Sequence, residues 1–321
     1  MAAPARGRAA RPRTPTVAEH HAEWLGLLRP EGPFLTVPVL AEVLPHGLDV
    51  VPDEVRDRVR QGWVEVREAP DLLTPAWVEL ILTELLRYPA AARADGSTLP
   101  AAGASGLRPD LLLLGPQPAG GRAVRLHVYR RPAGTPLTRA VGDRPALVEQ
   151  AAALCRDTGT PLALLTNGRH WVLAHARPGQ PTGWATFDAD LWLEEPLLLR
   201  AFATLLAMAR VLAPPTTPDG GHSTSLAGLF ARSAEALTQV TTTLGDQVRQ
   251  AVELFVGELA RLDRESHRTL LDGVSERDIY RGALTVLMRL VFLLYAEEQR
   301  LLPVADPLYA QAYAASTLYD Q

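Results

Sequence analysis

One aspartate and a run of arginines are the residues of this sequence best suited to chemistry on phosphate groups. Asp110 follows Pro109 at the start of an apolar run, where its carboxylate could hold a divalent cation. From Arg122 to Arg144 the sequence has six arginines and a single acid, Asp143. Because affinity for a duplex comes largely from neutralised phosphates, this basic segment predicts contact with a DNA backbone within a larger assembly.

Composition excludes several other kinds of site. All 32 basic residues are arginine, so chemistry that requires a lysine of this chain is impossible. Cys155 is the only cysteine, which excludes an internal disulfide and a cysteine-based zinc cluster, and its apolar helical surroundings predict an inert core thiol. The eight histidines lack the paired spacing of metal ligands. A net charge of −4 argues against a strong free-standing DNA binder.

The segments that position these residues differ in their hydrophobic period. Residues 1–16 are rich in arginine and proline without apolar periodicity, so we expect a disordered basic tail. In residues 17–90 apolar positions recur at helical spacing between frequent prolines, which predicts short helices. Residues 91–212 change to a strand-like pattern after a loop rich in Ala, Gly and Ser at 90–106.

The strand-like part predicts a small sheet. Val124, Leu126 and Val128 alternate with polar residues, which indicates a strand with one buried face. Strands are expected at 111–114, 124–128, 161–165 and 170–176, with a helix at 145–156 and a turn at Asn167–Gly168. The predicted fold class is therefore α/β (α+β), a small mixed sheet with flanking helices, preceded by short helices and followed by an all-α segment.

The C-terminal part is predicted to be helical. Residues 213–225 collect Pro, Thr, Gly and Asp and are expected to be a linker. In residues 226–321 the periodicity predicts one long amphipathic helix, or two that meet near Gly245. Residues 276–300 are apolar on nearly all sides, so we expect them to be buried among other helices, with Glu297 and Glu298 at a solvated helix end. The apolar run at 282–296 is too short and too interrupted for a membrane span.

Asp110 and the strand that ends in Val128–Pro132 (VYRRP) together resemble the PD-(D/E)XK nuclease fold. In that family an aspartate on one strand and an acid two residues before a lysine on the next strand hold a metal ion, which activates water against a phosphodiester. Here Val128 takes the acidic position and Arg130 the lysine position. A shift by one residue supplies His127 and Tyr129 instead, which again gives no carboxylate.

The helix of this candidate domain carries a further partial match. Gln150 corresponds to the glutamine of the family's helical Q-x-x-x-Y motif, but Leu154 stands where the tyrosine would be. The resemblance therefore implies a restriction-endonuclease-like domain over residues 91–212 that has lost its catalytic ligands and holds no metal. Asp110, Val128, Arg130 and Gln150 are its remnant nuclease positions.

Two other stretches are similar to restriction-modification enzymes. Residues 164–171 (LLTNGRHW) resemble the strand, turn and strand that follow the nuclease helix in type I and type IIG restriction enzymes. Residues 288–303 (MRLVFLLYAEEQRLLP), with 279–281 and 306–309, resemble the helical connector of type IIG-like methyltransferases, including the large methylase of DISARM-type defence systems. In those proteins the connector leads to a Rossmann-like methyltransferase domain that uses S-adenosylmethionine.

The resemblance covers about residues 19–321, and the glycine-rich cofactor loop and the Asn-Pro-Pro-Tyr motif of the methyltransferase are absent from this sequence. It implies a non-catalytic N-terminal part of a phage-defence or restriction-modification methyltransferase. A cytoplasmic location is expected because the Arg- and Pro-rich N-terminus lacks the apolar core of a secretory signal. This chain would bind no cofactor, whereas the parent enzyme would use S-adenosylmethionine. Its partners would be double-stranded DNA, bound weakly, and the methyltransferase domain or other defence subunits.

Four arginines are expected to position DNA phosphates near the old nuclease cleft: Arg122, Arg125, Arg130 and Arg131. Two alternatives remain open. The chain could be a protein-interaction scaffold that docks partner subunits through its apolar helices without touching DNA. It could also be an active nuclease, in which case magnesium-dependent cleavage would require Asp110.

Overall fold

The computed structural model describes residues 16–99, 106–117, 120–298 and 301–319. The predicted disordered tail thus lies outside the described residues, except for Thr16. The Thr16 hydroxyl accepts a hydrogen bond from the Glu19 N–H and caps the first helix. The chain divides into two compact units, residues 1–237 (unit 1) and residues 238–321 (unit 2).

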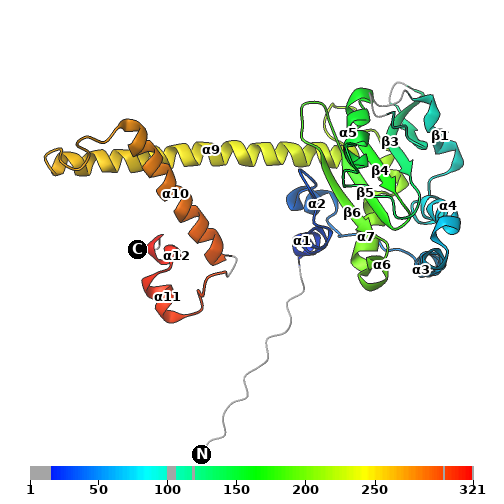
Figure 1. Cartoon of the computed structure of the whole chain (residues 1–321), viewed down its shortest axis with the longest axis horizontal. Coiled ribbons are helices and arrows are strands. Elements are labelled where there is room, and N and C mark those ends of the chain that lie inside the picture. Colours follow the sequence, from blue (N-terminus) through cyan, green and yellow to red (C-terminus); the bar gives the residue numbers. More distant parts are fainter. Residues whose placement is uncertain (1–15, 100–105, 118–119, 299–300, 320–321) are drawn as a thin grey trace, which may run out of the picture. The chain divides into compact units, whose positions relative to one another are not determined.

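Unit 1 is built on a six-stranded mixed sheet whose strands lie in chain order (Figure 1). Neighbouring strands are antiparallel except β3 and β4, which are parallel and are connected by helix α5, Leu147–Thr158. The strands are β1 Arg93–Asp95, β2 Leu111–Pro116, β3 Arg122–Arg130, β4 Leu162–Thr166, β5 His170–His175 and β6 Gly183–Asp188. The predicted α/β class with a small mixed sheet is confirmed, as is the order strand, strand, helix, strand, strand.

Strand β1 lies in a segment that the sequence predicts to be a loop. It is three residues long and pairs with β2 at the edge of the sheet. A strand of this length is too short to display a period of two, so only its pairing with β2 defines it.

Strand β3 differs from its prediction as a strand with one buried face. Leu126 and Val128 belong to the core on one side of the sheet, and Tyr129 belongs to the core on the other side. His127 is also fully buried. Because helices cover both faces and β3 lies between β2 and β4, residues 126–129 are buried whatever their polarity. The expectation of a half-buried strand is wrong there.

Helices cover both faces of the sheet. Helix α5 packs on one face, where Val148, Ala152 and Cys155 meet Tyr129 and Leu165. The main core lies on the opposite face. The helices that contribute to it are α1 Val17–Leu28, α2 Val37–Val43, α3 Asp53–Glu68, α4 Pro70–Leu80, α6 Leu191–Glu194, α7 Pro196–Leu205 and α8 Met208–Val211. A π-helical turn, Ile81–Leu85, extends α4.

A group of tryptophans joins the N-terminal helices to the sheet. The Trp77 ring of α4 lies 5.7 Å from Trp63 of α3 and 6.3 Å from Trp192 of α6. The indole N–H groups of Trp77 and Trp171 both donate to the Gly168 carbonyl, in the turn between β4 and β5. Residues 17–90 and 91–212, which the sequence predicts to be separate segments, therefore share one core.

Helix α9, Leu226–Glu265, is a single helix that passes through Gly245. Its first turns belong to unit 1. Phe230 packs against Phe34, with ring centroids 5.1 Å apart, and stacks on the His175 ring at 4.4 Å. The division between the units consequently falls at Leu237 and Thr238, after the expected linker of residues 213–225.

Unit 2 contains helix α10, Glu276–Glu298, followed by α11, Pro307–Ala312, and α12, Ala315–Tyr319. In α10 the side chains of Met288 and Phe292 are 58% and 68% exposed. The buried residues described in this helix are Ala283, Ala296 and Glu297. The expectation that this helix is buried among other helices is wrong within the described chain, because an apolar composition does not itself supply packing partners.

Helix α10 is, among the described helices, the one that is long and apolar enough to cross a membrane by length and composition. Length and composition alone are weak evidence for a membrane span, since core helices of other proteins meet the same two criteria. The expectation of no membrane span stays a prediction.

Glu297, near the end of α10, is not the solvated residue that the sequence predicts. Its carboxylate is buried and accepts hydrogen bonds from the Tyr309 hydroxyl at 3.0 Å and from the backbone N–H groups of Ala315 and Ser316 at 2.7 and 3.0 Å. Burial raises the pKa of Glu297, but the hydrogen bonds outweigh it and the pKa is lowered overall. This one carboxylate ties α11 and α12 to α10.

Candidate functional site

The pairing of β2 with β3 brings Asp110 to Arg130, as the sequence predicts for two neighbouring strands. Leu111 lies opposite Val128 in the ladder, and the Asp110 N–H donates to the Val128 carbonyl at 2.8 Å. The Arg130 N–H in turn donates to the Asp110 carboxylate at 2.7 Å. Asp110 is therefore fixed at the point where β3 ends.

The Asp110 carboxylate also binds the side chain of Arg131. The guanidinium donates to the same carboxylate oxygen at 2.9 Å, and the two side chains are 34% and 20% exposed. The guanidinium also lies over the Tyr129 ring, 5.8 Å from its centroid. A positive charge that belongs to the protein thus neutralises the one carboxylate of the remnant nuclease motif.

Val128 and Arg130 occupy the positions that the nuclease motif would give to an acid and a lysine. Val128 is fully buried in the main core, and Arg130 is exposed. Across the residues that the structure describes, no group of three or more His, Cys, Asp or Glu side chains could hold a metal ion. The arrangement around Asp110 favours binding of anions over binding of cations.

A cleft of about 700 Å³ lies beside Arg131. Its lining includes four arginines against one acid, and Gln150 stands at its edge on α5, where the side-chain amide donates to the Pro145 carbonyl at 2.7 Å. The charged residues of the lining are Arg108, Arg131, Arg139, Arg144 and Asp143. We call this feature the arginine cleft. Such a concentration of guanidinium groups attracts phosphate and other anions.

Arg108, Arg139 and Arg144 are exposed and make no ion pair with any described residue. Their guanidinium groups are consequently available to a ligand. Arg139 and Arg144 belong to the basic segment of residues 122–144, although they are not among the four arginines that the sequence predicts to position DNA phosphates. Arg108 precedes that segment, and the fold alone places it in the cleft.

Arg122 begins β3 at its other end, and Arg125 lies three residues further along the strand. The strand rises about 3.3 Å per residue, so Arg122 is about 26 Å from Arg130. Arg122 donates to the Ala91 carbonyl and Arg125 to the Pro116 carbonyl. Burial lowers the pKa of Arg125. The four arginines named from the sequence therefore do not form one patch.

Three titratable side chains are buried where α5 packs on β3. The Cys155 thiol is buried, as predicted for a core residue, and lies 3.8 Å from the His127 ring; burial raises its pKa to about 12. Burial lowers the pKa of His127 to about 4 and raises that of Tyr129. Burial thus favours the neutral form of each of these three groups.

Comparisons with known proteins add no assignment: no protein-family model, curated protein or solved structure matches this chain. The resemblance to restriction-modification methyltransferases stays a prediction that depends on the motifs quoted above.

Proposed function

We propose that unit 1 is a non-catalytic DNA-positioning module of a restriction-modification or phage-defence methyltransferase. It would hold the phosphate backbone of a duplex in the arginine cleft. Methyl transfer and the S-adenosylmethionine that it requires would belong to another part of the parent enzyme, which would also contribute affinity that this acidic chain lacks. The location of such an enzyme would be cytoplasmic.

One observation carries the proposal: Asp110 is neutralised by Arg131, which lines a cleft with three further arginines that make no ion pair to any residue the structure describes. A metal-dependent nuclease needs carboxylates that are free to bind a hard cation. Here the same corner of the sheet presents guanidinium groups, which bind phosphate oxygens through charge-assisted hydrogen bonds. Such contacts position a duplex and carry no sequence information.

The test compares two matched variants by fluorescence anisotropy with a short duplex at low salt. Arg139→Gln/Arg144→Gln removes two charges from the cleft, and Arg122→Gln/Arg125→Gln removes two charges from the far end of β3. We expect the first variant to weaken binding about tenfold and to reduce the salt dependence, because two phosphate contacts are lost. The second variant should bind like the parent chain.

An equal loss of duplex affinity in the two variants would argue for a diffuse basic surface. Unchanged duplex affinity in both variants would rule out DNA positioning. Thermal unfolding of each variant serves as the control for folding. None of the four side chains belongs to an ion pair among the described residues, so both variants should retain the fold.

An active nuclease is the first alternative function. It predicts magnesium-dependent cleavage that Asp110→Ala abolishes. Two observations argue against it. Asp110 is already ion-paired with Arg131, and Val128 supplies no second carboxylate. A single carboxylate that is already neutralised binds magnesium poorly.

A protein-interaction scaffold without DNA contact is the second alternative, and the exposed apolar surface of α10 favours it. Co-purification of a partner subunit in the absence of nucleic acid, together with unchanged DNA affinity in the cleft variant, would support the scaffold over the DNA-positioning module.

A further inference from the structure

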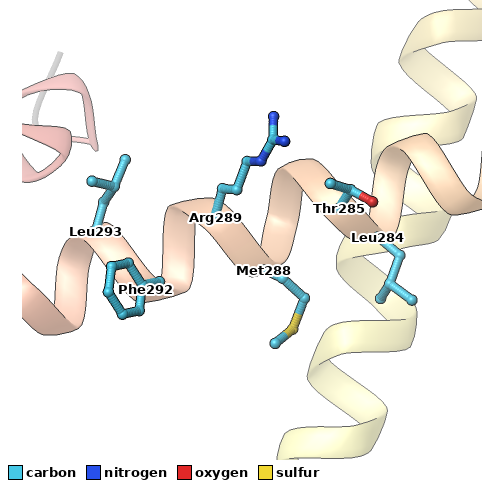
Figure 2. Close-up of a pocket in the computed structure, with 6 residues that line it drawn as sticks. All are labelled: Leu284, Thr285, Met288, Arg289, Phe292 and Leu293. Atoms are coloured by element: carbon cyan, nitrogen blue, oxygen red, sulfur yellow. The ribbon is translucent and has the colours of Figure 1, made fainter.

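Helix α10 carries a regular stripe of side chains, of which Leu284 is half-buried and the others are exposed. Its members are spaced alternately by three and four residues, the pattern with which two helices pack along a common seam. We call this stripe the α10 seam, and its residues are Arg281, Leu284, Met288, Val291, Tyr295 and Glu298. Figure 2 shows Leu284 and Met288 on the same side of the helix, next to the exposed ring of Phe292.

The seam faces away from the side on which α10 already packs. At 3.6 residues per turn, the buried residues Ala283, Ala296 and Glu297 lie on the other side of the helix. Glu297 holds α11 and α12 there through its hydrogen bonds. Met288, Val291 and Tyr295 are 58%, 55% and 56% exposed, so the apolar centre of the seam is open.

The two ends of the seam carry opposite charges. Arg281 and Glu298 are both exposed, and neither forms an ion pair with a described residue. They are separated by about 26 Å along the helix, since each residue advances about 1.5 Å. Between them the seam is apolar throughout.

This sequence is complementary to itself in the antiparallel direction. When two copies of the seam face each other with Met288 of one opposite Val291 of the other, Leu284 meets Tyr295 and Arg281 meets Glu298 at both ends. An isologous contact of this kind requires one patch that matches itself under a twofold rotation. The α10 seam meets that condition in both shape and charge.

We propose that the α10 seam is a dimerisation surface, on which the same helix of a second copy of this chain packs antiparallel. The seam contributes six side chains per copy, fewer than the roughly 20–30 residues that each partner contributes to a standard interface. The dimer is therefore weak and depends on protein concentration. This proposal is independent of DNA binding by the arginine cleft.

A lipid bilayer is the competing partner for an apolar helix. Insertion would place Arg289 near the centre of the membrane, where an unpaired guanidinium costs several kcal/mol by general membrane energetics. In the antiparallel dimer Arg289 points away from the seam, as Figure 2 shows relative to Leu284 and Met288, and stays in water. The charge at the middle of α10 thus favours a second protein chain.

The test is a charge exchange in the full chain, followed by sedimentation velocity over a concentration series. Arg281→Glu and Glu298→Arg each place like charges at both ends of the dimer, and each is expected to weaken association about tenfold or more. The double variant restores opposite charges and should return the dissociation constant to within about threefold of the parent. Arg289→Glu, on a side of the helix away from the seam, is the matched control and should leave the dimer intact.

A second measurement fixes the register without depending on affinity. Chains with Met288→Cys, mixed with chains with Val291→Cys, should form a crosslinked heterodimer under mild oxidation, since Cys155 is buried. A monomer at all concentrations would overturn the proposal, as would failure of the double variant to restore association. Flotation of the monomeric chain with phosphatidylcholine vesicles would also overturn it and assign the seam to a membrane.

Discussion

At the residue scale, Asp110 decides between two opposite chemistries. A free carboxylate there would attract a divalent cation, but the Arg131 guanidinium and the Arg130 N–H both bind it. Its remaining effect on a DNA ligand is repulsion, because a negative charge at the edge of the arginine cleft opposes a phosphate.

The first prediction follows from this charge. Asp110→Asn keeps an oxygen that can accept from the Arg130 N–H and removes the negative charge, so Arg131 becomes available to phosphate. We expect duplex affinity at low salt to rise about two- to fivefold, measured by fluorescence anisotropy. A catalytic or metal-binding Asp110 would give the reverse, a loss of magnesium-dependent binding or cleavage.

Buried histidines give unit 1 a pH dependence. Burial lowers the pKa values of His127 and His175 from 6.5 to about 4. Between pH 6.5 and 4 the unfolded chain therefore binds more protons than the folded chain, and the free energy of unfolding falls as the pH is lowered. Each histidine contributes up to about 3 kcal/mol to this loss.

Urea unfolding at pH 7, 5.5 and 4.5 measures this effect. A His175→Gln variant, which removes one of the two groups, should show a shallower loss of stability below pH 6.5, although it is less stable at pH 7 because the stacking on Phe230 is lost. A pH dependence equal to that of the parent chain would contradict the role of His175.

At the element scale, the C-terminal helices of unit 2 depend on one carboxylate. Glu297 accepts hydrogen bonds from Tyr309, Ala315 and Ser316. Glu297→Gln replaces one acceptor oxygen by a donor, which cannot serve the N–H groups at the start of α12. We expect amide hydrogen exchange over residues 306–319 to accelerate about tenfold or more.

Glu298→Gln is the matched control for this prediction, since Glu298 is exposed and its carboxylate forms no hydrogen bond or ion pair with a described residue. It should leave exchange in α11 and α12 unchanged at protein concentrations where the chain is monomeric. Equal acceleration in the two variants would show that the negative charge of the helix end matters more than the hydrogen bonds.

At the scale of the whole molecule, the end of unit 1 lies inside a continuous helix. Leu226, Leu229 and Phe230 of α9 are buried in the main core, although they follow the expected linker of residues 213–225. Removal of a large buried side chain costs about 2–5 kcal/mol, and a domain is stable by only about 5–15 kcal/mol.

Two truncations test this boundary. A chain that ends at Leu237 retains all three side chains and should unfold cooperatively, with stability close to that of unit 1 in the full chain. A chain that ends at Ser225 loses all three and should fail to fold, as measured by circular dichroism and urea unfolding. Similar stability of the two truncations would restore the boundary predicted from composition.

Local pattern alone predicts much of this protein. The alternation of Val124, Leu126 and Val128, the Asn167–Gly168 turn and the helical period of residues 145–156 define the central strands and the helix that crosses between them. Asp110 and Arg130 could be placed together because neighbouring strands in sequence usually pair. The absence of lysine and of a second carboxylate near Val128 is visible in the sequence without any structure.

Tertiary structure decided the features that depend on partners distant in sequence. No local pattern shows that Arg108 joins Arg139 and Arg144 in one cleft, that Arg122 is distant from Arg130, or that Glu297 is buried by Ala315 and Ser316. Likewise, the apolar composition of α10 predicts a buried helix, whereas its exposure depends on whether other helices of the chain pack against it. Periodicity is encoded by adjacent residues, but burial, charge clustering and the limits of a unit are set by contacts between elements, and these form only in the folded chain.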